Sequence, residues 1–228
     1  MTTTWQLATG NAHKAEEILA IVADFGVTLR TPKAAGITLE VDEWGTTFAA
    51  NAVVKAAAYA RASGLPALAD DSGIAIDALD GAPGVYSARF AGPGATDADN
   101  NARMVRELLL RGRRTSTARY HCVIAVALPT GLAARHDEQP RTAAAAEDGS
   151  PDGLDLGDLI IHTFSGRMEG SVCDTSEGQG GFGYDPYFRL PDGSPLATLS
   201  AAHKNAISHR GAALAKLRDW LAQGVQRG

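Results

Sequence analysis

The stretch Thr4–Arg30, TWQLATGNAHKAEEILAIVADFGVTLR, decides the fold class. Its opening residues, Thr4–Ala8, are typical of a short strand. The apolar side chains between residues 12 and 25 recur with the spacing of one helix face. Gly26 fits the residue that follows a helix end, and Val27–Arg30 is typical of a second strand. A strand, a helix and a strand in this order predict an α/β fold.

The rest of the chain shows further segments of both kinds. Strands are predicted at residues 65–70, 74–78, 117–128 and 158–164. Helices are predicted after Thr46 or Thr47, over 97–112, near Ser200 and over about 208–223. Glycines and prolines between residues 79 and 94 predict a loop or lid. Because no internal repeat and no linker interrupts the pattern, we expect one domain with two lobes over residues 1–228.

Residues 130–158 differ from the rest of the chain in composition. They contain seven acidic residues against two arginines and have no hydrophobic period, which predicts an acidic surface insertion. The whole chain has a formal net charge of −5, so the remainder is about neutral. This balance argues against a nucleic-acid partner, and any anion site must be a local cluster of cations and metal.

The cysteine count and the N-terminus predict a cytoplasmic protein. Cys122 and Cys173 are too few for a disulfide framework or a four-ligand zinc site, and unpaired thiols suit a reducing compartment. Cys122 stands in an apolar strand, which favours a core position over a nucleophile. The first residues lack a signal peptide, and no apolar run approaches about 18 residues, so no membrane partner is expected.

The turn between the first strand and helix is a candidate phosphate site. In Leu7–Lys14 (LATGNAHK) a strand ends, a Thr-Gly-Asn turn follows and a helix begins, so backbone amides and the helix N-terminus favour an anion. Thr9 and Asn11 add side-chain donors, and Lys14 lies one turn into the helix. The alternative is an ordinary turn with Asn11 as the N-cap.

Two adjacent carboxylates, Asp70 and Asp71, follow an apolar strand and are candidate metal ligands. Successive strand residues face opposite ways, so both reach one site only if the backbone turns, and Ser72-Gly73 predicts such a turn. Mg²⁺ is held by one or two carboxylates together with substrate phosphates. The alternative is that one carboxylate caps the loop backbone.

An acidic segment before the long helix adds a further candidate ligand. Glu43 precedes the helix on which Asn51 and Lys55 stand at positions i and i+4. Glu43 is expected to bind or orient a metal, and the alternative is a solvated acidic loop.

The glycine-rich segment Gly178–Gly183 matches G-x-G-x-x-G but does not predict a dinucleotide site. No buried strand precedes it, and Pro186 follows where a helix would have to open. We interpret it as a loop that displays Phe182, Tyr184 and Asp185, because an aromatic ring beside a carboxylate can stack on a base and accept a hydrogen from its edge. The alternative is a packing loop with Tyr184 buried.

Basic residues gather where the last two helices meet. Lys204 precedes the junction, and His209 and Arg210 fall in the first turn of the final helix, where cations oppose the helix dipole. They therefore call for an anionic or carbonyl partner, unless they are simply exposed surface charges.

Together these segments resemble the inosine triphosphate pyrophosphatase family. The matching stretches occur in the family's order along nearly the whole chain. They are LATGNAHK (7–14), TFAANAVVKA (47–56), LPALADDSG (65–73), GAPGVYSAR (81–89), GFGYDP (181–186) and SHRG (208–211).

The resemblance implies a fold, an activity and a cofactor. The expected fold is α/β, with a long twisted mixed sheet flanked by helices and two lobes with a central cleft. The expected reaction is hydrolysis of the purine nucleoside triphosphates ITP, dITP and XTP to the monophosphate and pyrophosphate. Mg²⁺ is the implied cofactor, with Mn²⁺ as a possible substitute, and a homodimer is the implied assembly.

The resemblance also implies roles for individual residues. Asp71 is the expected general base and a metal ligand, with Asp70 and Glu43 as supporting metal ligands. The expected triphosphate contacts are Thr9, Gly10, Asn11, Ala12, His13, Lys14, Lys55 and Lys204, and Ser72 is expected to touch the substrate. The expected base contacts are Phe182, Gly183, Tyr184, Asp185, His209 and Arg210.

Hydrogen-bond polarity agrees with this substrate class. The Arg210 guanidinium can only donate hydrogen bonds, so it can pair with a 6-oxo group but not with a 6-amino group. A site built in this way can discriminate against the 6-amino nucleotide by as much as ~10⁴–10⁵-fold.

One departure from the family's pattern leaves rival functions open. Ala50 stands where the family commonly has a glutamate near the metal, and Glu43 is the residue that could compensate. One rival is a Maf-like pyrophosphatase acting on pyrimidine or modified nucleotides. The other is a nucleotide-binding protein without turnover.

Overall fold

The computed structural model describes residues 3–22, 26–43, 45–130 and 154–225. The helices are α1 (Ala12–Val22), α2 (Pro32–Ala35), α3 (Phe48–Ser63), α4 (Asp97–Leu110), α5 (Ala201–Ile207) and α6 (His209–Val225). The strands are β1 (Thr3–Leu7), β2 (Val27–Arg30), β3 (Ala67–Ile76), β4 (Thr115–Pro129), β5 (Leu154–Asp155), β6 (Leu159–Cys173) and β7 (Phe188–Arg189). Short 3₁₀ helices cover residues 77–79, 84–89, 185–187 and 196–198.

The strands form one seven-stranded mixed sheet. Its order is β2-β1-β3-β4-β6-β5, and β7 pairs with β6. Strand β1 is parallel to β2 and β3, whereas β5 and β7 are antiparallel to β6. The expectation of a mixed α/β sheet flanked by helices is confirmed.

The chain divides into two compact units. The first comprises residues up to Asp71, Cys122–Gly166 and the chain from Arg210 onward, and the second comprises Ser72–His121 and Arg167–His209. Strands β3, β4 and β6 each continue from one unit into the other. Most of the predicted insertion, residues 131–153, lies outside the described residues.

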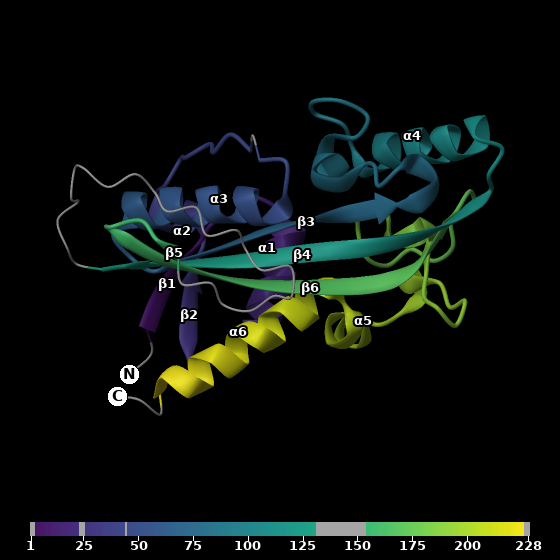
Figure 1. Ribbon diagram of the computed structural model, residues 1–228. Coiled ribbons are helices and arrows are strands. Elements are labelled where there is room, and N and C mark those ends of the chain that lie inside the picture. Colours follow the sequence, from purple (N-terminus) through teal and green to yellow (C-terminus); the bar gives the residue numbers. More distant parts are fainter. Residues whose placement is uncertain (1–2, 23–25, 44, 131–153, 226–228) are drawn as a thin grey trace. The chain divides into compact units, whose positions relative to one another are not determined.

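In the first unit, strand alternation sorts the core onto two faces of the sheet. Leu68 of β3 packs with β4 residues such as Ile124 against Ile18 of α1 and Leu214 of α6. The neighbouring position Ala69 faces the other way. Helices α3 and α6 accordingly cover opposite faces (Figure 1).

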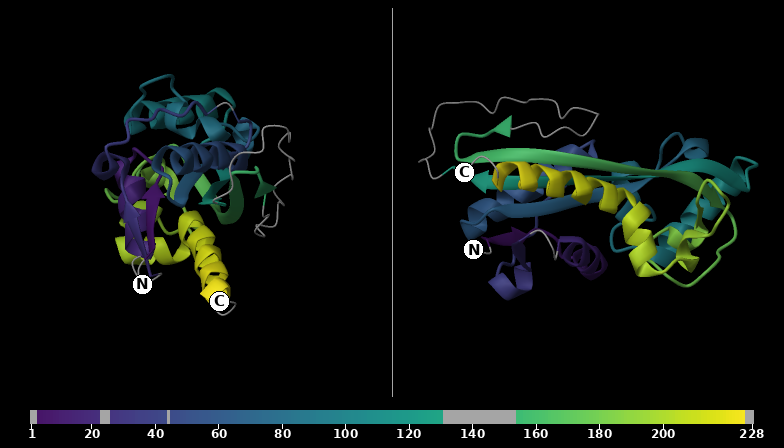
Figure 2. Two further views of the ribbon diagram at one scale, coloured as in Figure 1. Left: turned by 90° about the vertical axis from the view of Figure 1, so that its left-hand side faces the viewer. Right: turned by 90° about the horizontal axis from the view of Figure 1, so that it is seen from below.

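Helix α6 runs along β6, as Figure 2 shows from below. Trp220 of α6 packs against two β6 rings, with centroid distances of 5.7 Å to Phe164 and 4.7 Å to His162. This packing anchors the helix whose first turn carries Arg210.

Helix α3 begins and ends where the sequence predicts. Thr47 is its N-cap, because its hydroxyl accepts a hydrogen bond from the Ala50 amide at 3.1 Å. Gly64 ends the helix in the left-handed conformation, with φ of 68°. The face turned to the sheet is built from Ala52, Ala56 and Ala60, small residues that allow a close approach.

The turn predicted at Ser72-Gly73 is wrong, since β3 is one continuous strand through this point. Position 73 requires glycine because other backbone and side-chain atoms pack closely against it. A Cβ would lie 2.4 Å from the Ser87 hydroxyl oxygen and 2.6 Å from the Gly84 carbonyl oxygen. A glycine in a strand marks such close approach as readily as a turn.

The end predicted for the strand over residues 158–164 is also wrong, because β6 extends to Cys173. Gly170 in this extension again serves close approach. A Cβ there would lie 2.3 Å from the Arg189 carbonyl oxygen and 2.5 Å from the Phe188 ring of β7.

The second unit has a core of its own. Ile74 of β3, Tyr120 of β4 and Phe188 of β7 pack together with Met104 and Leu108 of α4. Helix α4 begins with a capping box in which Thr96 and Asp99 exchange hydrogen bonds.

Candidate active site

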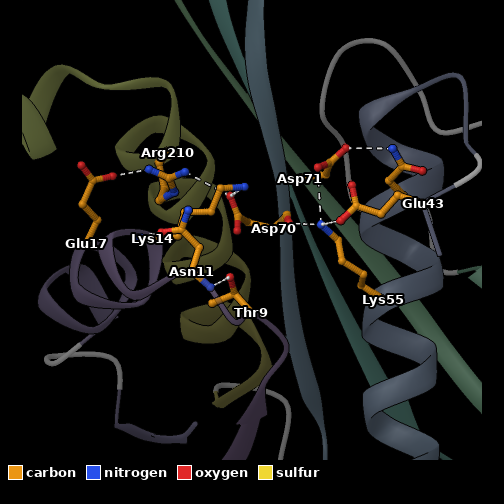
Figure 3. A network of polar contacts seen from close by, with 10 residues as sticks. Thr9, Asn11, Lys14, Glu17, Glu43, Lys55, Asp70, Asp71 and Arg210 are labelled. Atoms are coloured by element: carbon orange, nitrogen blue, oxygen red, sulfur yellow. Dashed lines mark hydrogen bonds and ion pairs between the residues drawn. The ribbon is translucent and has the colours of Figure 1, made fainter. Parts of the chain in front are cut away.

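Strand β3 places Asp70 and Asp71 on opposite faces of the sheet in the first unit. Asp70 shares the face of Leu68, under α1 and α6, and Asp71 shares the face of Ala69, under α3. Figure 3 shows the strand passing between two polar clusters, one on each face.

The Asp70 cluster joins α1 and α6. Lys14 Nζ lies 3.3 Å from Asp70 Oδ2, and Arg210 Nη2 donates to the same oxygen at 3.1 Å. Arg210 also donates to Glu17, one turn beyond Lys14 on α1, and is only 1% exposed. Glu17 belongs to no sequence motif that predicted the site, although its i+3 spacing from Lys14 places both on one helix face.

Charge pairing fixes the ionisation of this cluster. Burial opposes the charge on Asp70, but the positive charges of Lys14 and Arg210 outweigh it and hold the pKa of its carboxyl below the ordinary value. Burial likewise opposes the charge on Arg210, but Asp70 and Glu17 raise its pKa. Asp70 and Arg210 are therefore both charged around neutral pH.

The predicted phosphate turn lies beside this cluster. Strand β1 pairs in parallel with β3, with Leu7 opposite Leu68, so the turn after β1 follows directly next to Asp70. The Asn11 amide donates to the Thr9 hydroxyl at 3.2 Å, and the Lys14 amide donates to Asn11 Oδ1 at 3.1 Å. Asn11 is thus the N-cap, and residues 10–13 are exposed.

The Asp71 cluster is built on α3. Asn51 Nδ2 donates to Asp71 Oδ2 at 3.1 Å, and Lys55 Nζ lies 3.4 Å from Asp71 Oδ1. Lys55 also lies 3.1 Å from Glu43 Oε1 and donates to the Asp70 carbonyl oxygen at 2.7 Å. The predicted i, i+4 pair of Asn51 and Lys55 does face Asp71.

A backbone contact holds the segment carrying Glu43 in place. The Gly45 amide donates to Asn51 Oδ1 at 2.8 Å. A Cβ on Gly45 would lie 2.5 Å from that same oxygen, so the contact requires glycine. The Asn51 side chain thus holds both the Asp71 carboxylate and the backbone segment that carries Glu43.

The Asp71 cluster has the ionisation expected of a base. Burial raises the pKa of the Asp71 carboxyl, and Lys55 and Lys14 offset this only in part. Burial would lower the pKa of Lys55, but Asp71, Asp70 and Glu43 outweigh it and raise that pKa. A cationic lysine beside a carboxylate with a raised pKa is a pairing typical of functional sites.

The donor set fits a hard divalent cation with few protein ligands. Glu43 and Asp71 present carboxylate oxygens around one point, which Lys55 Nζ now bridges. No cluster of three or more His, Cys, Asp or Glu side chains suited to a metal occurs within the described ranges. Two carboxylates completed by substrate phosphates match Mg²⁺. The side chain of Asp70 is not brought to this point.

In the second unit, two predicted substrate contacts, Phe182 and Lys204, gather around Asp185. Lys204 Nζ donates to Asp185 Oδ2 at 2.7 Å, and the Phe182 amide donates to the same oxygen at 3.0 Å. Lys204 Nζ also lies 4.7 Å from the centroid of the Phe182 ring. Asp185 is 3% exposed, so this carboxylate is an internal anchor of the loop.

The glycine-rich loop is shaped by packing, in agreement with the rejection of a dinucleotide site. Gly181 has φ of 76°, and a Cβ there would lie 2.1 Å from Asp185 Oδ2. Gly183 donates its amide to Asp97 at 2.6 Å and accepts at its carbonyl from Asn101 at 2.8 Å. Tyr184 is buried and donates its hydroxyl to the Ser87 carbonyl oxygen at 2.8 Å, which matches the alternative of a packing residue.

His209 and Arg210 are the first two residues of α6, but their side chains contact residues of different units. The His209 ring stacks on Tyr120 with centroids 4.8 Å apart and an interplanar angle of 9°. Arg210 binds Asp70 and Glu17, so its role at a 6-oxo group stays a prediction. Ser72 follows Asp71 on β3 and is half-buried, and its substrate contact also stays a prediction.

The model of the Ham1 family matches residues 5–220. The chain belongs to the Ham1 family. The dITP/XTP pyrophosphatase of Geobacter sulfurreducens is 41% identical over 222 residues, which cover 96% of this chain and 98% of that one. The dITP/XTP pyrophosphatase of Chromobacterium violaceum is 44% identical over 212 residues, covering 92% and 93%. The resemblance to the inosine triphosphate pyrophosphatases is thereby confirmed.

Solved Ham1 structures share the fold. A HAM1 protein from Coxiella burnetii superposes with a TM-score of 0.77 at 33% identity, covering 97% of this chain and 99% of that one. A nucleoside-triphosphatase, or dITP/XTP pyrophosphatase, from Mycobacterium abscessus gives a TM-score of 0.64 at 32% identity, covering 94% and 98%. No helix of the described chain combines the length and the apolar character needed to span a membrane.

Proposed function

We propose that the protein is a Mg²⁺-dependent pyrophosphatase of non-standard purine nucleotides. Its substrates would be ITP, dITP and XTP, cleaved at the anhydride bond that separates the monophosphate from pyrophosphate. The observation that carries the proposal is the Asp71 cluster, in which a buried carboxylate with a raised pKa faces Lys55 and Glu43. Membership of the Ham1 family and relatives named dITP/XTP pyrophosphatase support the same substrate class.

The triphosphate would bind at the edge of β3 beyond the end of β1, where the Asp70 and Asp71 clusters lie on either side of the strand. Lys14 and Lys55 each supply a positive charge, and each is held ready by an ion pair with a β3 carboxylate. The turn after β1 adds backbone amides and the N-terminus of α1. These groups would neutralise part of the roughly four negative charges of a nucleoside triphosphate. They do so locally, because the chain outside the acidic insertion is about neutral overall.

Asp71 is the proposed general base. Its carboxylate would orient a water and take its proton as the water attacks phosphorus, while Asn51 holds the carboxylate by one oxygen. Mg²⁺, held by Glu43 and Asp71, would neutralise developing charge on the phosphate oxygens. Asp70 binds Lys14 and Arg210 instead, so its proposed part is to fix these cations, and a direct metal contact stays a prediction.

The base would be recognised by residues of the second unit. The Phe182 ring offers a stacking surface, and His209 and the Asp185 loop are the polar groups proposed to recognise the base. Lys204, which binds Asp185 beside this ring, is proposed to neutralise phosphate charge. We also propose that the protein acts in the cytoplasm as a homodimer. The unpaired thiols of Cys122 and Cys173 suit a reducing compartment.

A substrate panel tests the proposal. Pyrophosphate release would be measured with ITP, dITP, XTP, GTP, ATP and UTP in Mg²⁺ and in Mn²⁺. We expect fastest turnover on the inosine and xanthosine nucleotides. Fastest turnover on UTP would favour the Maf-like alternative, and ITP binding without pyrophosphate at any metal concentration would favour a binding protein.

A further inference from the structure

Tyr120 of β4, which lies in none of the sequence motifs, connects two of the proposed base-recognition residues. Its hydroxyl donates to Asp185 Oδ1 at 3.0 Å. The face of its ring stacks on His209 with centroids 4.8 Å apart and planes within 9°. Tyr120 is itself 6% exposed and packs against Phe188, so its own position is fixed by the core.

The Asp185 carboxylate divides its bonds between its two oxygens. Oδ2 accepts from Lys204 Nζ and from the Phe182 amide, and Oδ1 accepts from Tyr120. A carboxylate this deeply buried must have its oxygens satisfied, because an unpaired one costs about 1–3 kcal/mol or more. The Tyr120 hydroxyl therefore determines how the carboxylate is rotated, and with it where the ammonium of Lys204 is held.

The tyrosine remains a donor under all working conditions. Burial, and then the negative charge of Asp185, raise the pKa of Tyr120 well above its ordinary value. The hydroxyl thus keeps its proton, which points at Asp185 Oδ1. The contact is a fixed hydrogen bond to a charged acceptor, one of the stronger kinds in proteins.

We propose that Tyr120 is a positioning residue for purine recognition, which holds Asp185 through its hydroxyl and supports His209 through its ring. This inference rests on the proposed function, because it assigns these residues to the base. Tyr120 touches neither the base nor the reacting phosphorus in this scheme. It acts by fixing the orientation of the side chains that do.

Two variants separate the hydroxyl from the ring. Tyr120→Phe removes only the bond to Asp185, and Tyr120→Leu also removes the surface under His209. The first measurement is the affinity for inosine monophosphate without metal, by calorimetry, which needs no turnover. The second is the ratio of kcat/KM for ITP to that for ATP.

We expect Tyr120→Phe to weaken inosine monophosphate binding about tenfold, because Asp185 and Lys204 are then no longer held in one orientation, and residues without ligand contact can change affinity by this order. The ITP/ATP ratio should fall by a similar factor, with kcat for ITP within about twofold, because the bond serves binding alike in the ground and transition states. Tyr120→Leu should lower both the inosine monophosphate affinity and the ITP/ATP ratio further.

Tyr59→Phe is the matched control, since it also removes a buried tyrosine hydroxyl, here bonded to the Leu39 carbonyl oxygen at 3.0 Å in the first unit. It should lower thermal stability, by less than Tyr120→Phe because its acceptor is uncharged, and leave the ITP/ATP ratio unchanged. The inference is overturned if Tyr120→Phe leaves both the affinity and the ratio within twofold of wild type, or if Tyr59→Phe changes the ratio equally. Wild-type protein that releases no pyrophosphate from ITP would instead contradict the proposed function, and the monophosphate affinities would still decide the role of Tyr120.

Discussion

Asp70 and Asp71 are consecutive residues of one strand, yet their carboxylates bind different lysines on opposite faces of the sheet. Asp70 Oδ2 lies 3.3 Å from Lys14 Nζ, and Asp71 Oδ1 lies 3.4 Å from Lys55 Nζ. The same pair differs in ionisation, since the pKa of Asp70 is lowered and that of Asp71 is raised. Adjacent titratable groups whose environments separate their pKa values have distinct tasks in catalysis.

Asp71→Asn should abolish turnover and spare binding. Asparagine keeps the shape and one acceptor oxygen but cannot take a proton, so pyrophosphate release from ITP should fall at least about 10²–10⁴-fold. The affinity for ITP should stay within roughly tenfold, as measured by calorimetry. Asp158→Asn, at the exposed pair with Arg61, is the control and should leave turnover unchanged. A variant at residue 71 that retains most activity would contradict the assignment of the base.

Lys55→Met should move the acidic limb of the pH–rate profile. If Asp71 is the general base, its unprotonated form is the active one, so activity should rise as pH rises through its pKa, which burial has raised. The charge of Lys55 favours the carboxylate, so removing it raises that pKa further and shifts the limb to higher pH. The test is to measure kcat/KM for ITP from pH 5 to 9 and to fit the apparent pKa of the acidic limb. Weaker phosphate binding would lower the whole profile without moving this pKa. A limb that stays in place would mean that another group titrates.

Much of the first unit follows from sequence patterns, because its determinants are local. The capping hydroxyl of Thr47 and the left-handed Gly64 bound α3 by interactions within a few residues. The spacing of Asn51 and Lys55 placed both side chains on the face that meets Asp71. Local signals of this kind do not depend on which strands become neighbours.

The errors arise where a distant segment decides the local structure. Ser72-Gly73 predicts a turn from the sequence, but Gly73 lies within β3, where Ser87 and Gly84 come too close for a side chain. Gly170 in β6 is explained by β7 in the same way. The roles of Glu17 and Tyr120 were missed because their partners, Arg210 and Asp185, lie 193 and 65 residues away. Spacing along the chain cannot reveal such pairs.

Arg210→Met should destabilise the protein strongly at neutral pH. The guanidinium is 1% exposed and binds Asp70 and Glu17, so its removal leaves buried carboxylate charge with fewer partners, at a cost of about 3 kcal/mol. The exposed Arg61→Met, which breaks the pair with Asp158, should cost no more than about 1 kcal/mol. Urea unfolding at pH 7 measures both, and equal losses would contradict the importance of the buried cluster.

The stability lost in Arg210→Met should depend on pH with a definite sign. The folded-state pKa of Asp70 is below its unfolded value of about 3.9, so its ionisation adds stability above that value, and this is lost as pH falls through the folded-state pKa. The difference in unfolding free energy between wild type and variant should therefore be largest near pH 7 and shrink below about pH 4. A difference that is constant from pH 7 to pH 3 would show that lost packing, and not charge, is responsible.

Ala50→Glu should strengthen metal binding. Ala50 is exposed in the first turn of α3, directly before the Asn51 that holds Asp71, so a glutamate there adds a third carboxylate beside Glu43 and Asp71. The first turn of α3 contains no acid, and a negative charge at a helix N-terminus is favourable, so folding should not suffer. The Mg²⁺ concentration for half-maximal pyrophosphate release should fall about three- to tenfold, because affinity rises with the number of charged ligands. Ala50→Gln matches the size without the charge and should behave as wild type. If the glutamine variant improves metal binding as much as the glutamate variant, or if neither does, the added carboxylate does not reach the metal and Glu43 is already sufficient.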